Sequence, residues 1–154
     1  MTEPPTRVEI AILAPVDRVY EMLASVTRMG EWSTECVRCR WIGDVRQARP
    51  GARFRGTSRK GWHRWSTVST ITVAEPGRAF EFAVSYFRRP VATWRYDLHE
   101  DRGDTIVTES VRDQRGRLLR IVSPLITGSR QRETRNAETM NNTLERIKAA
   151  AEAM

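Results

Sequence analysis

The feature that most constrains the fold is a change of hydrophobic period in the last third of the chain. Up to about residue 112, apolar residues mainly alternate with polar ones, as they do in strands that are buried on one face. Over residues 129–151 they recur every three or four residues instead, at Ala137, Met140, Leu144, Ile147 and Ala151. The sequence therefore predicts a sheet followed by one long amphipathic helix.

The N-terminal segment predicts a strand and then two short helices. Residues 7–13 alternate as a strand, and Pro15 ends it because proline cannot donate a hydrogen bond to a sheet. A helix with one apolar face is then expected to about residue 25, with Asp17 or a neighbour as its cap. Residues 29–33 predict a second short helical turn.

Six further strands are predicted before the long helix. Proline or glycine stands at residues 49–51, 75–77 and 101–104, which is the chemistry of turns. The predicted strands span residues 36–42, 52–58, 64–74, 79–87, 91–99 and 104–112. Residues 118–126 are too apolar for an ordinary surface loop, and two interpretations stay open: a flap across the mouth of a pocket, or an extra core segment beside the long helix.

Alternate residues of a strand point to opposite faces, so a sheet that curves around a helix turns one side of each strand towards a cavity. On this basis the strand at 36–42 turns Val37, Cys39 and Trp41 inward, and the strand at 64–74 turns Ser69 and Val73 inward. Aromatic side chains with a few polar groups are typical of sites for small apolar ligands, although the same aromatics are also ordinary core residues. The predicted cavity consists of Trp41, Trp65, Ser69, Phe82, Trp94, Tyr96, Val107, Glu109, Ala137, Met140, Asn141 and Leu144.

Glu109 is the sharpest polar candidate of this set, because a carboxylate among apolar neighbours is costly unless a partner satisfies it. A ligand contact and a structural salt bridge to Arg132 or Arg135 of the long helix both stay open. The amides of Asn136 and Asn141 are either ligand contacts or solvent-facing groups.

The two cysteines have CxxC spacing, at Cys36 and Cys39. A structural zinc site needs four ligands, and no second pair of cysteines exists. Regular strand alternation over these residues places the two thiols on opposite faces. We therefore expect neither a metal nor redox chemistry here, and no cofactor.

The charge is strongly basic, with a formal net charge of +7. Residues 38–64 hold most of a positive surface, with Asp44 as their only acid and with Trp41, Phe54, Trp62 and Trp65 between the arginines. Such a surface attracts nucleic acid, anionic headgroups or an acidic protein, but it is also an ordinary solvated sheet face. Trp62 separates these interpretations: exposed beside the basic stretch it favours a surface partner, and folded under it favours the pocket.

The length of 154 residues predicts a single domain over 1–154. No apolar run reaches the roughly 20 residues needed to span a bilayer, and the first residues do not resemble a signal peptide. A cytoplasmic location follows as the default expectation. A homodimer is compatible with the sequence, but no residue argues for one.

Several motifs, taken in this order, carry a resemblance to a known superfamily. They are Ala14-Pro15, Val19-Tyr20, Leu23, Gly30-Glu31-Trp32, Pro50-Gly51 with Phe54, Glu75-Pro76, Trp94-Arg95-Tyr96 and Gly103-Asp104-Thr105. The chain resembles, over nearly its whole length, the START-like (SRPBCC) superfamily, and within it the bacterial polyketide cyclase/dehydrase and lipid-transport group, many of whose members are actinobacterial. The resemblance implies an α+β helix-grip (Bet v 1-like) fold, in which a curved antiparallel sheet of about seven strands wraps a long C-terminal helix.

Fold does not fix function in this superfamily, so two main functions compete. The first, which we favour, is binding or transport of a hydrophobic small molecule such as a lipid, polyketide or quinone. The second is cyclisation and dehydration of a polyketide, which needs a general base and a donor to the developing enolate. His63, His99 and Glu109 are weak candidates for that chemistry, and no nucleophile, HExxH or phosphate-loop motif is present. An interaction module that uses the basic surface of residues 38–64 to bind a protein, or with less expectation a nucleic acid, is a further alternative.

Overall fold

The computed structural model describes residues 6–33, 36–113 and 129–154, with side chains described for all of these except residues 60 and 129–136. Its elements follow the predicted order. They are β1 (Thr6–Ile12), α1 (Val16–Ala24), the 3-10 helix η1 (Val26–Glu31), β2 (Cys36–Trp41), β3 (Arg53–Lys60), β4 (His63–Glu75), β5 (Ala79–Tyr86), β6 (Arg89–Asp101), β7 (Asp104–Asp113) and α3 (Ser129–Glu152).

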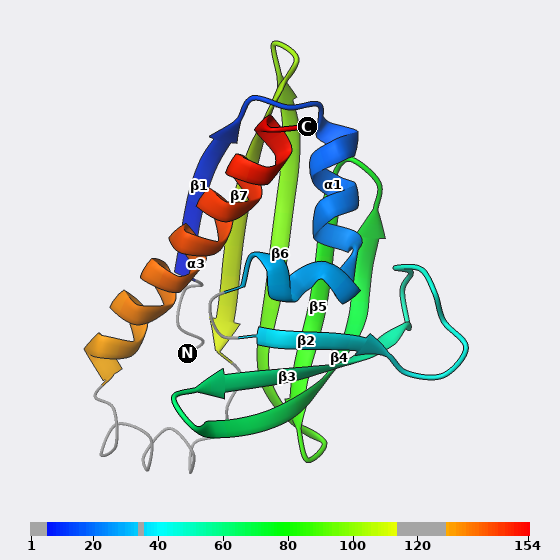
Figure 1. Ribbon diagram of the computed structural model, residues 1–154, viewed down its shortest axis with the longest axis vertical. Helices are drawn as coiled ribbons and strands as arrows, with labels where there is room; N and C mark the ends of the chain where they lie inside the picture. Colours follow the sequence, from blue (N-terminus) through cyan, green and yellow to red (C-terminus); the bar gives the residue numbers. More distant parts are fainter. Residues whose placement is uncertain (1–5, 34–35, 114–128) are drawn as a thin grey trace.

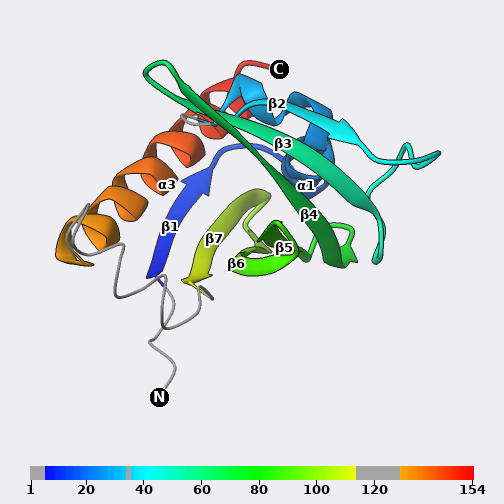
Figure 2. The ribbon, with the colours of Figure 1, turned by 90° about the horizontal axis from the view of Figure 1, so that it is seen from below.

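The seven strands form one antiparallel sheet in the order β1-β7-β6-β5-β4-β3-β2. Figure 1 shows α3 and α1 over one face of this sheet, and Figure 2 shows the sheet curving around the helices, with β2 packed against η1. This architecture is the expected α+β helix-grip fold. The predicted flap or core segment at 118–126 lies outside the described residues.

Strand β7 shows how the sequence produces a two-sided sheet. Its residues alternate between partly exposed and buried from Asp104 to Val111, with Thr105, Val107, Glu109 and Val111 buried. The buried set faces the helices, and the hydroxyl of Thr105 donates a hydrogen bond of 2.8 Å to the backbone oxygen of Ala14. This bond holds the connection between β1 and α1 against the sheet.

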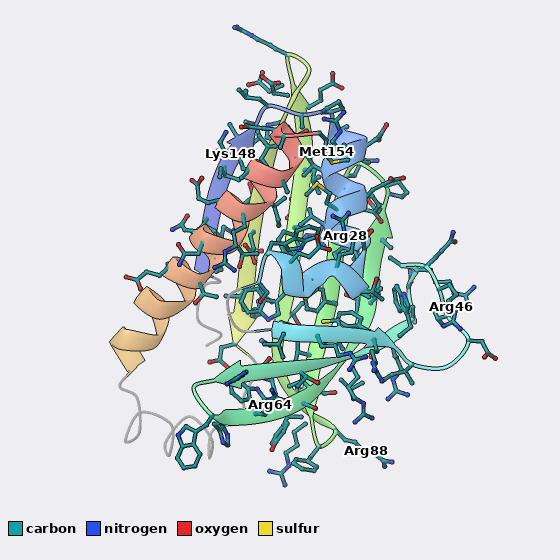
Figure 3. The ribbon with its side chains drawn as sticks, in the orientation of Figure 1. Arg28, Arg46, Arg64, Arg88, Lys148 and Met154 are labelled. Carbon is teal, nitrogen blue, oxygen red and sulfur yellow. The ribbon has the colours of Figure 1, made fainter. Side chains whose placement is uncertain are left out.

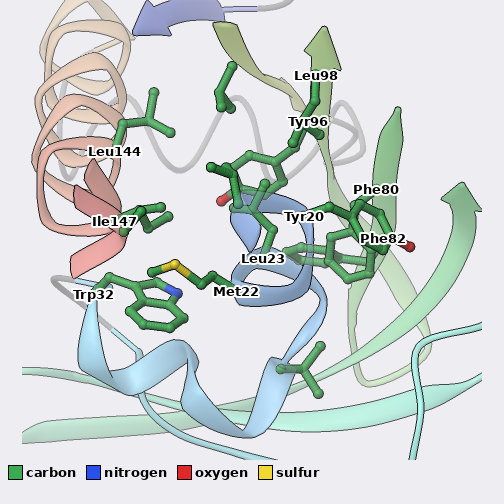
Figure 4. Packing of buried hydrophobic residues seen from close by; sticks show 14 of the residues in the cluster. Tyr20, Met22, Leu23, Trp32, Phe80, Phe82, Tyr96, Leu98, Leu144 and Ile147 are labelled. Atoms are coloured by element: carbon green, nitrogen blue, oxygen red, sulfur yellow. The ribbon is translucent and has the colours of Figure 1, made fainter. Parts of the chain in front are cut away.

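Helix α1 begins after Pro15, whose fixed φ suits a helix start. The expected cap by Asp17 is wrong, because no side chain caps this helix and Asp17 lies within the first turn, where its charge suits the helix dipole. The inner face of α1 is buried through Val19, Tyr20, Met22 and Leu23. Figure 4 shows these side chains meeting residues of η1, α3 and the sheet in one cluster that includes Trp32, Phe80, Leu144 and Ile147.

The C-terminal end of α3 is held to the edge of β1 by polar contacts. Lys148 donates to the backbone oxygen of Ala11 at 2.9 Å, and the backbone N–H of Leu13 donates to Glu152 at 2.8 Å. Lys148 and Glu152 also pair with each other at 2.7 Å, one turn apart. These contacts, together with the apolar seam at Leu144 and Ile147, fix where α3 crosses the sheet.

Candidate functional site

The centre of the concave face is an acid and a phenol on neighbouring strands. Glu109 of β7 lies directly opposite Tyr96 of β6 in the register, and the Tyr96 hydroxyl donates a hydrogen bond of 2.8 Å to Glu109 Oε1. On its other side Glu109 is opposite Val8 of β1. The carboxyl group is therefore surrounded by sheet residues on three strands.

Glu109 is only 2 % exposed, and within the described part of the chain its second oxygen, Oε2, has no hydrogen-bond partner. Burial disfavours a charge, so it raises the pKa of Glu109 to about 8, while the hydrogen bond from Tyr96 acts to lower it. Burial, and then the nearby Glu109, raise the pKa of Tyr96 well above its ordinary value. At neutral pH the carboxyl group is thus mostly neutral and able to donate a proton.

Apolar side chains extend from this pair in both directions along the strands. Towards one end, Trp94 lies opposite Val111, and Met140 of α3 packs on Val111 and Ala92. Towards the other end, Val107 lies opposite Leu98 and belongs to the larger buried cluster with Leu144. The predicted residues Trp94, Tyr96, Val107, Glu109 and Met140 therefore gather around one polar centre.

A second group of predicted residues lies further along the concave face. Ser69 and Phe82 are buried, and Trp41 and Trp65 are partly buried. Phe54, which the sequence interpretation left out of the cavity, links them: its ring meets Trp41 at 6.1 Å and Phe82 at 5.4 Å, edge to face. The signal was present in the sequence, because Phe54 alternates with the arginines of its strand.

Other predicted residues lie apart from this face. Asn141 is exposed, so its place in the predicted cavity is wrong: Met140 and Leu144 define the buried stripe of α3, and the next position points about 100° away from it. Ala137 is partly buried. Arg132, Arg135 and Asn136 lie outside the described side chains, so the expected salt bridge to Glu109 stays a prediction.

The two histidines are not part of the concave centre. His63 and His99 are both exposed, His63 in the β3–β4 hairpin and His99 near the end of β6. The ring of His63 lies 5.6 Å from that of Trp65. Neither histidine is paired with Glu109 or Tyr96 in the register. Of the three predicted acid–base candidates, Glu109 is therefore the one placed to act on a molecule bound at the concave face.

Two β-bulges overturn the face assignments that assumed regular alternation. The register shifts between Cys36 and Arg38, which leaves Val37 50 % exposed. It also shifts between Ile71 and Val73, so that Ala74 and not Val73 continues the inner face, opposite Phe80. A bulge adds one residue to a strand, and this reverses the facing of every residue beyond it.

The first bulge also overturns the prediction that the two thiols lie on opposite faces. Cys36 and Cys39 both face the concave side, and their sulfur atoms are 3.1 Å apart. Groups of three or more His, Cys, Asp or Glu side chains suited to a metal ion do not occur among the residues that the structure describes.

The basic surface lies on the opposite, convex face of β2, β3 and β4. Arg40 stands directly opposite Arg55, and Arg59 directly opposite Arg64, all four exposed. The aromatic residues Trp41, Phe54 and Trp65 lie on the other face of the same strands, so they do not interleave with the arginines as the sequence suggested. Trp62 is the exception, 98 % exposed in the turn between β3 and β4.

The exposed end of the sheet carries a second aromatic turn. Phe87 and Arg88, which connect β5 to β6, both have positive φ (49° and 65°), a region that bulky residues seldom adopt. Phe87 is 83 % exposed. Figure 3 places Arg64, beside the β3–β4 turn, and Arg88 at the same end of the molecule.

A membrane-spanning helix is not found in the described parts of the chain, since none is long and apolar enough. A comparison with curated proteins finds no match. Solved structures with the same fold include the polyketide-cyclase-like protein Cgl2372 of Corynebacterium glutamicum, at 28 % identity and a TM-score of 0.63 over 94 % of this chain and 90 % of that one. They also include major latex-like protein 151 of Panax ginseng, at 11 % identity and a TM-score of 0.72 over 96 % of this chain and 97 % of that one.

A further similar structure is StfQ, a di-domain ARO/CYC protein of the steffimycin biosynthetic pathway, at 13 % identity and a TM-score of 0.75. The match covers 97 % of this chain and 50 % of StfQ, so the chain spans half the length of that protein. Residues 5–152 match the family described as polyketide cyclase/dehydrase and lipid transport. The match covers most of the sequence and agrees with the helix-grip fold, and the chain belongs to this family of the SRPBCC superfamily.

Proposed function

We propose that the protein binds a small apolar molecule with one oxygen function, between the concave face of the sheet and α3. The observation that carries this proposal is the buried Glu109, whose Oε2 has no partner among the described residues. A buried polar atom without a hydrogen bond is costly, and a ligand carbonyl or hydroxyl placed there would remove that cost.

The surroundings of Glu109 indicate the rest of the ligand. Val107, Val111 and Met140 are buried and apolar, and Trp94 is only partly buried. A partly exposed tryptophan on an inner face is apolar surface that a ligand would cover. A lipid, a polyketide or a quinone combines the required apolar area with at least one oxygen that can pair with Glu109.

The neutral form of Glu109 sets the direction of the ligand hydrogen bond. With a pKa of about 8, the group mostly carries its proton at neutral pH. Oε1 already accepts from Tyr96, so the acid proton on Oε2 is the group left to donate. A ligand carbonyl is the matching acceptor.

Native mass spectrometry of the purified full chain, followed by organic extraction, is the first test. We expect a stoichiometric apolar compound to travel with the protein. Menadione then serves as a defined quinone probe in a fluorescence titration. We expect Glu109→Gln, which keeps its shape but donates more weakly, to bind it about tenfold less tightly.

The matched control is Glu81→Gln, because Glu81 lies on β5 among the outward-facing residues and pairs with Arg95 at 3.1 Å. Its affinity for menadione should equal that of the natural protein. An empty protein that also fails to bind menadione would contradict the proposal.

Polyketide cyclisation with dehydration is the alternative function, and the same pair is its candidate centre. A neutral carboxylic acid can protonate a leaving hydroxyl, and the hydrogen bond from Tyr96 holds the Glu109 carboxyl group in place for that step. The two functions differ in what is recovered. A carrier returns its compound unchanged, whereas a cyclase returns a product that is lighter by one water molecule, and Glu109→Gln would stop that loss.

A second candidate function is docking on an anionic membrane, and the exposed Trp62 is the observation that favours it. Trp62 and Phe87 are exposed in the β3–β4 and β5–β6 turns. Figure 3 places Arg64 and Arg88, which are close to them in sequence, at one end of the molecule. Exposed aromatics flanked by arginine suit a headgroup region that carries negative charge. A single-stranded nucleic acid fits less well, because its bases stack on aromatics that share a face with the basic residues.

Co-sedimentation with phosphatidylglycerol vesicles tests this docking. We expect binding that weakens steeply with salt, little binding to phosphatidylcholine vesicles, and a loss of more than half of the bound fraction in a Trp62→Ala, Phe87→Ala variant. The control is Arg102→Ala, in the exposed β6–β7 turn at the opposite end of the molecule (Figure 1). Binding to single-stranded RNA without binding to vesicles would contradict the membrane proposal.

A further inference from the structure

The paired thiols of β2 are arranged for a reaction that the proposed function does not use. The Cys36 and Cys39 sulfur atoms are 3.1 Å apart, closer than the contact distance of two unbonded sulfur atoms, which is about 3.6 Å. The bulge between Cys36 and Arg38 creates this geometry, because it turns both side chains to the concave side of the strand.

The neighbours of the two sulfur atoms leave the space between them open. Gly56 lies directly opposite Cys39 on β3, and a Cβ atom placed on it would lie 3.6 Å from the Cys39 sulfur and 3.9 Å from that of Cys36. The sulfur of Met29, on η1, lies 3.8 Å from that of Cys39. The two thiols and the Met29 sulfur therefore form a small cluster of sulfur atoms between η1, β2 and β3.

The two thiols differ in exposure. Cys39 is 4 % exposed, whereas Cys36 is partly exposed. The hydrogen bond from the Cys39 thiol lowers the pKa of Cys36, and the same bond together with burial raises the pKa of Cys39. Cys36 is thus the thiol that solvent reaches and that ionises first, and the thiolate is the reactive form.

We propose that Cys36 and Cys39 form a redox-active dithiol, which closes to an intramolecular disulfide when a hydroperoxide oxidises it. The Cys36 thiolate attacks the terminal oxygen of the hydroperoxide, the O–O bond breaks, and the alkoxide leaves as an alcohol after taking up a proton. Cys36 is then a sulfenic acid. The Cys39 sulfur attacks it, the S–O bond breaks, and the hydroxide leaves as water with the Cys39 proton. In total, two thiols and one hydroperoxide give one disulfide, one alcohol and one water molecule.

The movement that this reaction needs is small. A disulfide bond is about 2.05 Å long, so the sulfur atoms must approach by about 1 Å. The bulge already places both on the same side of the strand, and Gly56 offers no side chain in the way. Reduction by a dithiol reagent would reopen the pair.

The reduced full-length protein, treated with cumene hydroperoxide, tests the proposal. We expect the intact mass to fall by two hydrogen atoms and both thiols to resist maleimide after unfolding. Trypsin gives a decisive assignment, because Arg38 lies between the cysteines and cleavage after it separates them. Peptides 29–38 and 39–40 should stay joined in the oxidised sample and separate after reduction.

Two variants separate the roles of the thiols. Cys39→Ser should stop at the Cys36 sulfenic acid, detected as one added oxygen that reacts with dimedone. Cys36→Ser should lose its remaining thiol at least tenfold more slowly than the natural protein, because Cys39 is buried. Circular dichroism of both variants checks that they fold.

The hydroperoxide treatment and peptide mapping of the unsubstituted protein test the proposal even if neither variant folds. Retention of both thiols, conversion to sulfinic acid with no joined peptides, or a disulfide between two chains as the main product would overturn the proposal. None of these outcomes depends on whether the protein binds an apolar ligand, so the test is independent of the proposed function.

Discussion

Tyr96 and Glu109 face each other across β6 and β7 and share a hydrogen bond of 2.8 Å inside the concave face of the sheet. Both side chains are buried, and Glu109 Oε2 has no further partner in the described residues. The free energy of this buried pair therefore depends on whether Glu109 carries a proton and on whether a ligand pairs with Oε2.

The stability of the protein should fall with rising pH because of Glu109. Burial raises the pKa of its carboxyl group from an ordinary 4.5 to about 8. Between these two pH values the folded protein holds the proton and the unfolded chain has lost it. The stabilisation by protonated Glu109 is thus complete below about pH 4.5 and is lost as the pH rises through about 8.

Glu109→Gln cannot ionise, so it isolates this effect. We expect the free energy of unfolding of the natural protein to fall, relative to that of the variant, by on the order of a few kcal/mol from pH 5 to pH 9. Urea unfolding at several pH values measures the difference. Glu138→Gln, at an exposed position of α3, is the control and should show a constant difference. A constant difference for Glu109→Gln as well would refute the assignment.

Removal of the Tyr96 hydroxyl should destabilise the protein through Glu109. In Tyr96→Phe the carboxyl group loses its described hydrogen-bond donor, at an expected cost of about 1–3 kcal/mol in the free energy of unfolding. The hydrogen bond from Tyr96 acts to lower the pKa of Glu109, so its loss should raise that pKa further. A double-mutant cycle with Glu109→Gln measures the coupling between the two side chains, and a coupling near zero would show that they act separately.

Gly30 should not tolerate a side chain. A Cβ atom there would lie 2.8 Å from the backbone oxygen of Val37, so η1 would have to move away from β2. We expect Gly30→Ala to lower the free energy of unfolding by about 1–3 kcal/mol. Gly56→Ala is the matched control, because its Cβ would meet side chains at ordinary contact distances of 3.6 Å and more. Equal effects of the two changes in urea unfolding would contradict this prediction.

The arginine pair Arg40 and Arg55 should cost stability at low salt. Like charges directly opposite in an antiparallel sheet repel, so Arg55→Glu should raise the free energy of unfolding by about 0.5–1 kcal/mol and lose this gain at high salt. Arg53→Glu is the control, because it changes the net charge of +7 by the same amount at a residue that lies opposite the uncharged Thr70. If both variants gain equally, the effect does not come from the cross-strand pair.

The sequence was sufficient to predict the fold wherever the hydrophobic period stayed regular. In β7 the alternation is unbroken, so the inward position of Glu109 follows from it directly. The partner of Glu109 could not be predicted in this way, because Tyr96 meets it only through the register of β6 against β7. Register depends on the packing of the whole sheet and leaves little trace in either strand alone.

The errors have two physical sources. A bulge reverses alternation without any residue that marks it, which misplaced Val37 and Val73 and hid the contact of the two thiols. The prediction for Asn141 was wrong because of its position around the helix axis. It directly follows the buried Met140, and the next residue along a helix already points away from the buried stripe. The position of Trp62 in a turn of the basic stretch, in contrast, indicates from the sequence alone that its exposure separates a surface partner from a buried core, and Trp62 is exposed.

The ammonium and carboxylate groups at the end of α3 have a consequence for self-association. Strand β1 is one of the two edge strands of the sheet, and such a strand can recruit a strand from another chain through its unpaired backbone groups. Lys148 occupies the oxygen of Ala11, and Glu152 occupies the N–H of Leu13. At the C-terminal end of β1 the helix thus occupies two backbone groups that would otherwise be open to β-pairing with another chain.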